Sequence, residues 1–122
     1  LIEGNPHFQF VLGAPGGMTA EVRNLMFLLD TCKQHLGNNF TWSALGIGRG
    51  HLPIVLAALA LGGNVRVGME DNILYRKGEL AQSNTWFVER VKRLAAEVDK
   101  TIATPDETRA MLGLIRQQPV SA

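Results

Sequence analysis

The chain has 122 residues, the size of one ordinary domain. Its 12 Lys and Arg residues nearly balance 11 Asp and Glu residues, which removes the electrostatic case for a dedicated nucleic-acid-binding protein. A hydrophobic content of 46% is too high for a disordered chain. The longest apolar run, residues 52–61, is well short of the ~20 residues that cross a membrane, so no membrane partner is expected. The single Cys32 excludes a disulfide framework and fits a reducing, cytoplasmic compartment.

The first predicted unit is a buried strand at residues 8–13 (FQFVLG), followed by a glycine-rich loop and a helix at residues 19–36. Thr19 is the expected N-cap of that helix, and Gly37 is expected to end it. The unit therefore has the order strand, loop, helix.

Two more units repeat this order of elements without repeating the sequence. The second has a strand at residues 41–46 and a helix from Leu52 to Leu61. The third has a strand at residues 65–68, a long loop to Gln82, and a helix at residues 83–100.

A last short helix is predicted after the third unit. It opens with Thr104-Pro105-Asp106-Glu107, which has the residue types of a capping box with Pro at the first helical position.

Three strand–loop–helix units in series predict parallel strands, either in an open doubly wound sheet or in a (β/α)8 barrel. Three parallel strands alone would leave two exposed edges, which favours the barrel, and a complete barrel takes roughly 250 residues. We therefore predict an α/β fold in which this chain is part of a barrel. In it, residues 1–122 are the last three βα units of a single TIM-barrel domain, plus the short helix.

The third strand carries the strongest chemical signal, in the block RVGMEDN. Because strand side chains alternate, Arg66, Gly68 and Glu70 are expected on one face, and Asp71 should open the loop at the carboxyl end. Three ionisable groups this close together are costly to bury unless they are paired or bind a metal. The two interpretations are a catalytic or metal site, and a structural ion pair beneath a loop.

Two glycine-rich loops are candidate anion sites. The backbone at Gly16 and Gly17 could bind an anion at the start of a helix, although a tight βα turn is an equal alternative. Arg49 could bind a carboxylate or phosphate, or could simply be solvated. The three histidines form no cluster, so each is expected at the surface or in a loop rather than as a ligand.

The helix from Leu52 to Leu61 is apolar nearly all round, whereas an outer barrel helix should have one hydrated face. A subunit interface would cover it, which predicts a homo-oligomer. Cover by another part of the same chain is the alternative.

Together these pieces resemble a known family. FVLGAPGGM, WSALGIGR, GGNVRVGMEDN and ATPDETRAMLGL, in this order and spacing, are similar to the C-terminal part of the β-keto acid cleavage enzymes. The resemblance implies a zinc-dependent TIM barrel that converts a β-keto acid and acetyl-CoA into acetoacetate and a shortened acyl-CoA. It also implies that Glu70 is a zinc ligand, that Asp71 and Arg66 are catalytic, and that the protein is a homo-oligomer.

The histidine pair that completes the family's zinc site does not occur in these residues. The remaining ligands are therefore expected upstream of this chain, and the chain alone is expected to be inactive. The alternatives are another TIM-barrel aldolase or isomerase, and a catalytically incomplete barrel fragment.

Overall fold

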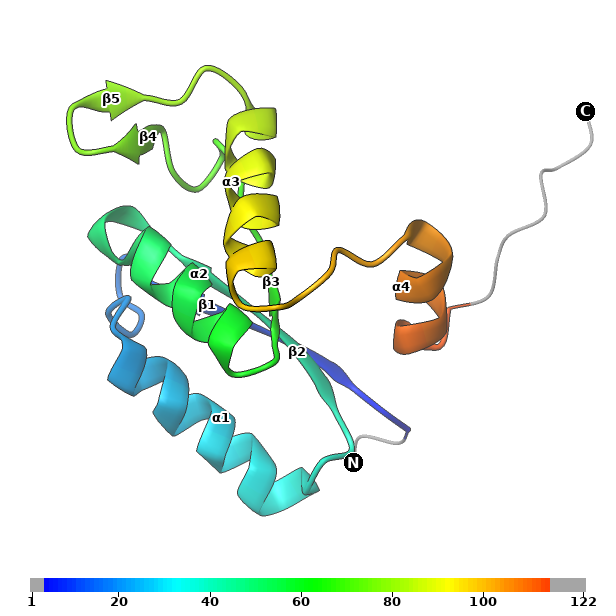
Figure 1. The fold of residues 1–122 in the computed structure, drawn as a ribbon. Helices are drawn as coiled ribbons and strands as arrows, with labels where there is room; N and C mark the ends of the chain where they lie inside the picture. Colours follow the sequence, from blue (N-terminus) through cyan, green and yellow to red (C-terminus); the bar gives the residue numbers. More distant parts are fainter. Residues whose placement is uncertain (1–3, 115–122) are drawn as a thin grey trace, which may run out of the picture.

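A computed structural model describes residues 4–114 of the chain (Figure 1). The strands β1 (His7–Leu12), β2 (Thr41–Gly46) and β3 (Asn64–Val65) form a parallel sheet in the order β1-β2-β3. Helix α1 (Val22–Leu36) connects β1 to β2, and α2 (His51–Ala60) connects β2 to β3. The predicted alternation of parallel strands and helices is confirmed.

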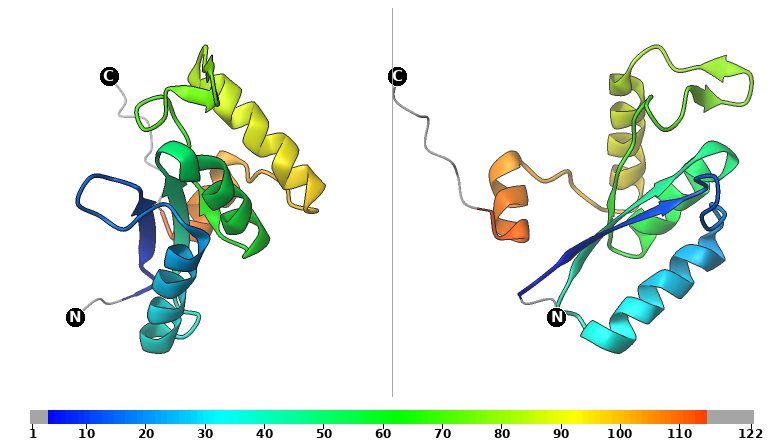
Figure 2. Two further views of the ribbon diagram at one scale, coloured as in Figure 1. Left: turned by 90° about the vertical axis from the view of Figure 1, so that its left-hand side faces the viewer. Right: turned by 180° about the vertical axis from the view of Figure 1, so that it is seen from behind.

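The main core lies between the sheet and these two helices. Alternate residues of β1 point toward the helices, as expected for a strand covered on one face, whereas residues 42–46 of the central strand β2 are all buried. The fully packed members of this core are Phe10, Leu12, Leu25, Leu29, Trp42, Ala44, Ile54 and Ala58. On the other face of the sheet, none of the helices in the described part of the chain covers β1 (Figure 2), and Val11 is 43% exposed.

The segment after β3 differs from the sequence prediction. The backbone N–H of Arg66 still donates to the Ala44 carbonyl (3.0 Å), but the regular strand has already ended. The expected long loop contains a two-stranded antiparallel hairpin, β4 (Leu74–Arg76) and β5 (Glu79–Leu80). Its turn includes Gly78 at φ +77°, a conformation that favours glycine. The strands are too short for periodicity to reveal them.

Two further helices follow the hairpin. Helix α3 (Asn84–Glu97) packs Val91 and Ala95 against α2, and α4 (Pro105–Leu112) ends the described chain. The predicted capping box is confirmed, because Thr104 Oγ1 accepts from the Glu107 N–H and Glu107 Oε2 accepts from the Thr104 N–H. No helix in residues 4–114 has the length and apolarity needed to cross a membrane.

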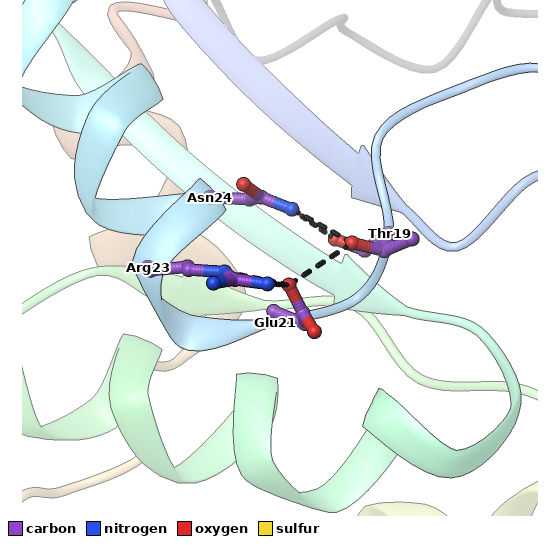
Figure 3. A network of polar contacts seen from close by, with 4 residues as sticks. All are labelled: Thr19, Glu21, Arg23 and Asn24. Atoms are coloured by element: carbon purple, nitrogen blue, oxygen red, sulfur yellow. Dashed lines mark hydrogen bonds and ion pairs between the residues drawn. The ribbon is translucent and has the colours of Figure 1, made fainter.

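The expected start of α1 is wrong by three residues. Glu21 is the residue before the helix, and its side chain caps no backbone N–H. Thr19 is instead engaged in a surface network in front of the helix, shown in Figure 3. Its hydroxyl donates to Glu21 (3.2 Å) and accepts from Asn24 Nδ2 (2.9 Å). Arg23 Nε also donates to the Glu21 carboxylate (2.7 Å), so side-chain contacts fix this turn without a cap.

Helix α2 is not exposed on every apolar side. Leu59 is buried against Val91 and Ala95 of α3, so that part of the helix is covered within the chain. Leu52 and Leu56 remain 37% and 41% exposed. The predicted interface is therefore restricted to the outer stripe that contains these two leucines.

Candidate functional site

Three loops meet at the carboxyl edge of the sheet, because parallel strands end at the same edge. The first loop follows β1 and the second follows β2, and Ile47 N donates to the Leu12 carbonyl between them (2.8 Å). A Cβ at Gly13 would lie 2.8 Å from the Ile47 oxygen, and one at Gly50 would overlap Ala20. Glycines at these two positions therefore allow the first and second loops to touch.

Asn72 joins the third loop to the second. Its Oδ1 accepts from the backbone N–H of Gly48 (2.7 Å), and its Nδ2 donates to the Gly46 carbonyl (2.9 Å). Nδ2 also lies 3.2 Å from Nδ1 of His51. Asn72 is only 7% exposed, so its amide satisfies backbone groups that water reaches poorly.

His51, at the start of α2, is buried, which corrects the expected surface or loop position. Burial lowers the pKa of its imidazole, the Gly46 backbone opposes that shift, and the positive charge of Arg90 adds to it. The ring packs edge-on against Phe87, with centroids 5.2 Å apart. A neutral ring accepts at Nδ1 from Asn72, which a protonated ring does not.

Arg66 contacts both acids of the third loop. Its Nη2 lies 3.1 Å from Asp71 Oδ2 and 3.7 Å from Glu70 Oε1. Strand alternation has already ended before these residues, so both acids lie within reach of the same guanidinium. Asp71 N and Asn72 N both donate to the Gly68 carbonyl, which closes a turn through these residues.

Gly68 determines where the Glu70 carboxylate can lie. A Cβ at Gly68 would overlap Oε2 and Oε1 of Glu70, so the carboxylate occupies the space that a larger residue would fill. Glu70 therefore folds back over the strand end toward Arg66. The expected grouping of Arg66, Gly68 and Glu70 occurs, but through a turn rather than through an extended strand.

Asp71 is the more enclosed of the two acids. Its side chain is 16% exposed, against 54% for Glu70, and its buried Oδ2 accepts no hydrogen bond despite the nearby guanidinium. Asp71 and Arg49 line the same cavity of about 1240 Å³. Arg66, Glu70 and Asp71 thus lie together, and Arg49 lines the same cavity as Asp71.

The loop of Gly16 and Gly17 is closed by its own hydrogen bonds. Gly17 N donates to the Ala14 carbonyl (3.0 Å), and Gly13 N donates to Met18 (2.7 Å). Gly16 has φ +78°, so the tight-turn interpretation accounts for the glycine there. Anion binding by these residues stays a prediction.

Residues 4–114 contain no group of three His, Cys, Asp or Glu side chains arranged to hold a metal ion. Glu70 is a carboxylate donor with more than half of its side chain accessible. It could supply one ligand to a metal held jointly with groups from elsewhere.

Sequence reasoning missed Asn72 and His51 as parts of this edge. Asn72 stands in the same GGNVRVGMEDN block as the acids, which was the available signal. Its partners lie 21 to 26 residues away in sequence, so only the fold reveals them.

Comparisons with known proteins identify the family. A family model described as beta-keto acid cleavage enzyme matches residues 1–114. The 3-keto-5-aminohexanoate cleavage enzyme of Fusobacterium nucleatum subsp. nucleatum is 45% identical over 114 residues, covering 93% of this chain and 40% of that protein.

Two other relatives agree with this match. The 3-keto-5-aminohexanoate cleavage enzyme of Acetoanaerobium sticklandii is 44% identical over 88% of this chain and 38% of its own length. The 3-oxoadipate:acetyl-CoA acetyltransferase of Cupriavidus necator is 39% identical over 93% of this chain and 39% of its own length. The chain thus spans about 40% of the length of these curated relatives, and it belongs to the β-keto acid cleavage enzyme family.

Proposed function

We propose that this chain is the C-terminal part of an enzyme that converts a β-keto acid and acetyl-CoA into acetoacetate and a shortened acyl-CoA. The observation that carries the proposal is the contact of Arg66 with both Glu70 and Asp71 where three loops meet. The names of the relatives support the two substrate classes. The complete protein would form the TIM barrel, with this sheet as its last three strands, and active sites of such barrels lie at this edge.

Stability does not explain the cluster well. The side chains of Arg66 and Glu70 are 44% and 54% exposed, and ion pairs this exposed contribute at most about 1 kcal/mol. Asp71 is nearly enclosed, yet one of its oxygens accepts no hydrogen bond. This oxygen is held by the Arg66 ion pair without a hydrogen bond, so the loss of its hydration is only partly compensated, which favours a chemical role over a purely structural ion pair.

The residues fit zinc as part of a site. Glu70 offers an accessible oxygen ligand of a kind that zinc accepts, whereas a catalytic zinc takes about three protein ligands. Glu70 would therefore be one ligand, with the others outside this chain. When bound, the metal would polarise the keto and carboxylate oxygens of the substrate.

Asp71 is the proposed base, with Arg66 orienting its carboxylate. Asp71 takes a proton from the carbon between the two carbonyls of the β-keto acid. That carbon bonds to the acetyl carbon as the C–S bond of acetyl-CoA breaks. The released thiolate attacks the original keto carbon of the β-keto acid. The bond between that keto carbon and the central carbon then breaks, and the proton held by Asp71 returns to the central carbon. The products are acetoacetate and the shortened acyl-CoA.

The test compares two variants of the complete protein. Glu70→Ala is expected to lose zinc and activity, because one of about three ligands is removed. Asp71→Asn is expected to keep zinc but lose turnover by roughly 10²-fold or more. Elemental analysis and kcat for an acetyl-CoA-dependent reaction distinguish these outcomes.

Arg66→Met is expected to resemble Asp71→Asn, because the two residues act as a pair. Arg109→Met is the control, since within residues 4–114 Arg109 forms its ion pair with exposed Asp106 on α4 and none with the site residues. Near-normal zinc content and rates in all three site variants would exclude this site. Zinc loss in Asp71→Asn with retention in Glu70→Ala would reverse the two roles.

We also propose that the outer stripe of α2, at Leu52 and Leu56, lies in a subunit interface. Both leucines are exposed on this chain, although apolar residues dominate the helix. Leu56→Arg in the complete protein should lower the sedimentation coefficient, because a buried unpaired charge opposes association. A folded variant with unchanged sedimentation would show that the stripe is covered within one subunit.

A further inference from the structure

Basic side chains converge on a cavity beside the proposed active site. The cavity has a volume of about 1240 Å³ and lies between β4 with its turn, α3 and the start of α2. Five cations line it, Arg49, Arg76, Lys77, Arg90 and Arg93, with Asp71 as the only carboxylate among the lining residues. The whole chain has a net charge of only +1, so this wall is a local concentration of positive charge.

Arg90 and Arg93 are arranged around one tyrosine. The guanidinium carbon of Arg90 lies 3.3 Å from the centroid of the Tyr75 ring, and Arg93 Nη2 donates to Tyr75 Oη (3.0 Å). The pKa of the Tyr75 hydroxyl is lowered, mainly by its polar contact with the Arg90 guanidinium; burial opposes this shift and the positive charge of Arg90 adds to it. Tyr75 is itself buried and packs against Trp86 and Phe87, so it is a fixed platform.

Neither of these arginines has an acidic partner in the described part of the chain, 4–114. Arg76, by contrast, forms an ion pair with Glu79 (3.0 Å). Placing two cations near each other without a counter-charge is unfavourable, and an anion between them would relieve the repulsion. The arrangement therefore suits a ligand that brings negative charge.

The geometry favours phosphate as that ligand. When a guanidinium stacks on an aromatic ring, its N–H groups lie in a plane parallel to the ring and point outward. In that position they can bind two phosphate oxygens at once. Stacking also restricts the side chain before the ligand arrives, which reduces the entropy lost on binding. A carboxylate ligand would use only part of the five cations on this wall.

We propose that this cavity binds the phosphate groups at the nucleotide end of a CoA thioester, with Arg90 and Arg93 as the main contacts. The inference rests on the proposed function, in which acetyl-CoA is the second substrate. Asp71 lines the same cavity as the two arginines, so one continuous space connects the proposed base with the basic wall. The thioester end would then extend toward Asp71.

The test measures binding of adenosine 3′,5′-bisphosphate, a fragment that carries the nucleotide phosphates, to the complete protein by titration calorimetry. Arg90→Gln and Arg93→Gln are each expected to weaken binding about tenfold, the scale of a lost charge-assisted hydrogen bond. Lys92→Gln is the matched control, because Lys92 lies on α3 and carries the same charge but lines a different cavity. Its affinity should stay within about twofold of the unchanged protein, and binding should weaken with added salt.

Kinetics supply the second readout. Both arginine variants should raise KM for acetyl-CoA about tenfold and leave KM for the keto acid unchanged. Bisphosphate binding equal to that of Lys92→Gln in both folded variants would overturn the proposal. Equal affinity for inorganic phosphate and the bisphosphate would also overturn it, because the cavity would then be a free-phosphate site.

Failure of the proposed function would be seen separately, since calorimetry needs no turnover. A protein that binds the bisphosphate through Arg90 and Arg93 but forms no acetoacetate would retain the nucleotide site and refute the proposed reaction.

Discussion

The carboxyl edge of the sheet and helix α4 are stabilised in opposite ways. At the edge, Asn72 bonds to groups 21 to 26 residues away in sequence, and it is buried. In α4, Thr104 and Glu107 bond to each other, three residues apart, and no residue of the helix is buried. In Figure 1, α4 extends away from the layer of α1, α2 and α3.

This difference predicts where a substitution has its effect. Removing a contact between distant segments should destabilise the whole domain and displace the site residues. Removing a contact within one turn should loosen that turn alone. Each of the following experiments tests one side of this comparison.

The largest effect is expected for Asn72→Ala. The change leaves the Gly48 N–H and the Gly46 carbonyl without their partner in a poorly hydrated position. We expect the free energy of unfolding to fall by about 3 kcal/mol, measured by urea denaturation of the complete protein. Turnover should fall as well, because Asn72 follows Asp71 directly.

Asn24→Ala is the control for this substitution. Asn24 also makes two side-chain hydrogen bonds to Thr19, but these are exposed to solvent, as Figure 3 illustrates. Water can replace them, so the loss should stay below about 1 kcal/mol. Equal losses for the two variants would contradict the importance of burial at the carboxyl edge.

Gly68→Ala should affect the site more than the fold. A methyl group there would displace the end of the Glu70 side chain, which is flexible, rather than any backbone atom. We expect a folded protein with zinc affinity reduced about 10- to 100-fold, the scale seen when a ligand loses its support. A competition titration with a chelator measures this without relying on activity.

Glu79→Ala serves as the comparison, since it removes an exposed carboxylate from the neighbouring hairpin. Its zinc affinity should be unchanged. Normal zinc affinity in Gly68→Ala would mean that the Glu70 carboxylate does not need the space over Gly68.

The pH dependence of stability should reveal His51. Its pKa in the folded chain lies below the ordinary 6.5, mainly because burial disfavours the cation. Between the lowered pKa and 6.5 the unfolded chain binds more protons, so stability falls as the pH is lowered through this range. Above 6.5 the contribution is fully present, and the slope below it is at most about 1.4 kcal/mol per pH unit.

His51→Gln should remove this part of the slope in denaturation experiments at several pH values. His35→Gln should keep it, because His35 is exposed near the end of α1. An unchanged slope in His51→Gln would assign the acid sensitivity to another group.

The order of strands and helices could be predicted because it depends on local patterns. Strand 41–46 was predicted at its observed bounds, and the capping box at Thr104 has its predicted bonds. The hairpin β4–β5 could not be predicted, since Leu74–Arg76 and Glu79–Leu80 are too short for periodicity to distinguish them from loop. The start of α1 was misplaced because side-chain contacts among Thr19, Glu21 and Asn24 compete with a helix cap.

The candidate site was predictable only in part, because only some of its contacts join residues that are close together in sequence. The residues Arg66, Glu70 and Asp71 stand close together in sequence, so their proximity followed from the chain itself. Their orientation did not, because the turn after Gly68 ends strand alternation. Tyr75, Arg90 and Arg93 come together only when the hairpin folds against α3, which no spacing in the sequence indicates.

The smallest effect is expected for Thr104→Ala, the local side of the comparison. Loss of the cap removes the acceptor for the Glu107 N–H and costs about 1 kcal/mol in the helix itself. Because α4 buries none of its residues, this loss should appear as faster amide exchange within Pro105–Leu112 and not in the sheet. Thr101→Ala changes an exposed threonine in the preceding connection and should leave that exchange unaltered. Faster exchange in β1 and β2 after Thr104→Ala would mean that α4 is coupled to the core, and would remove the contrast with Asn72.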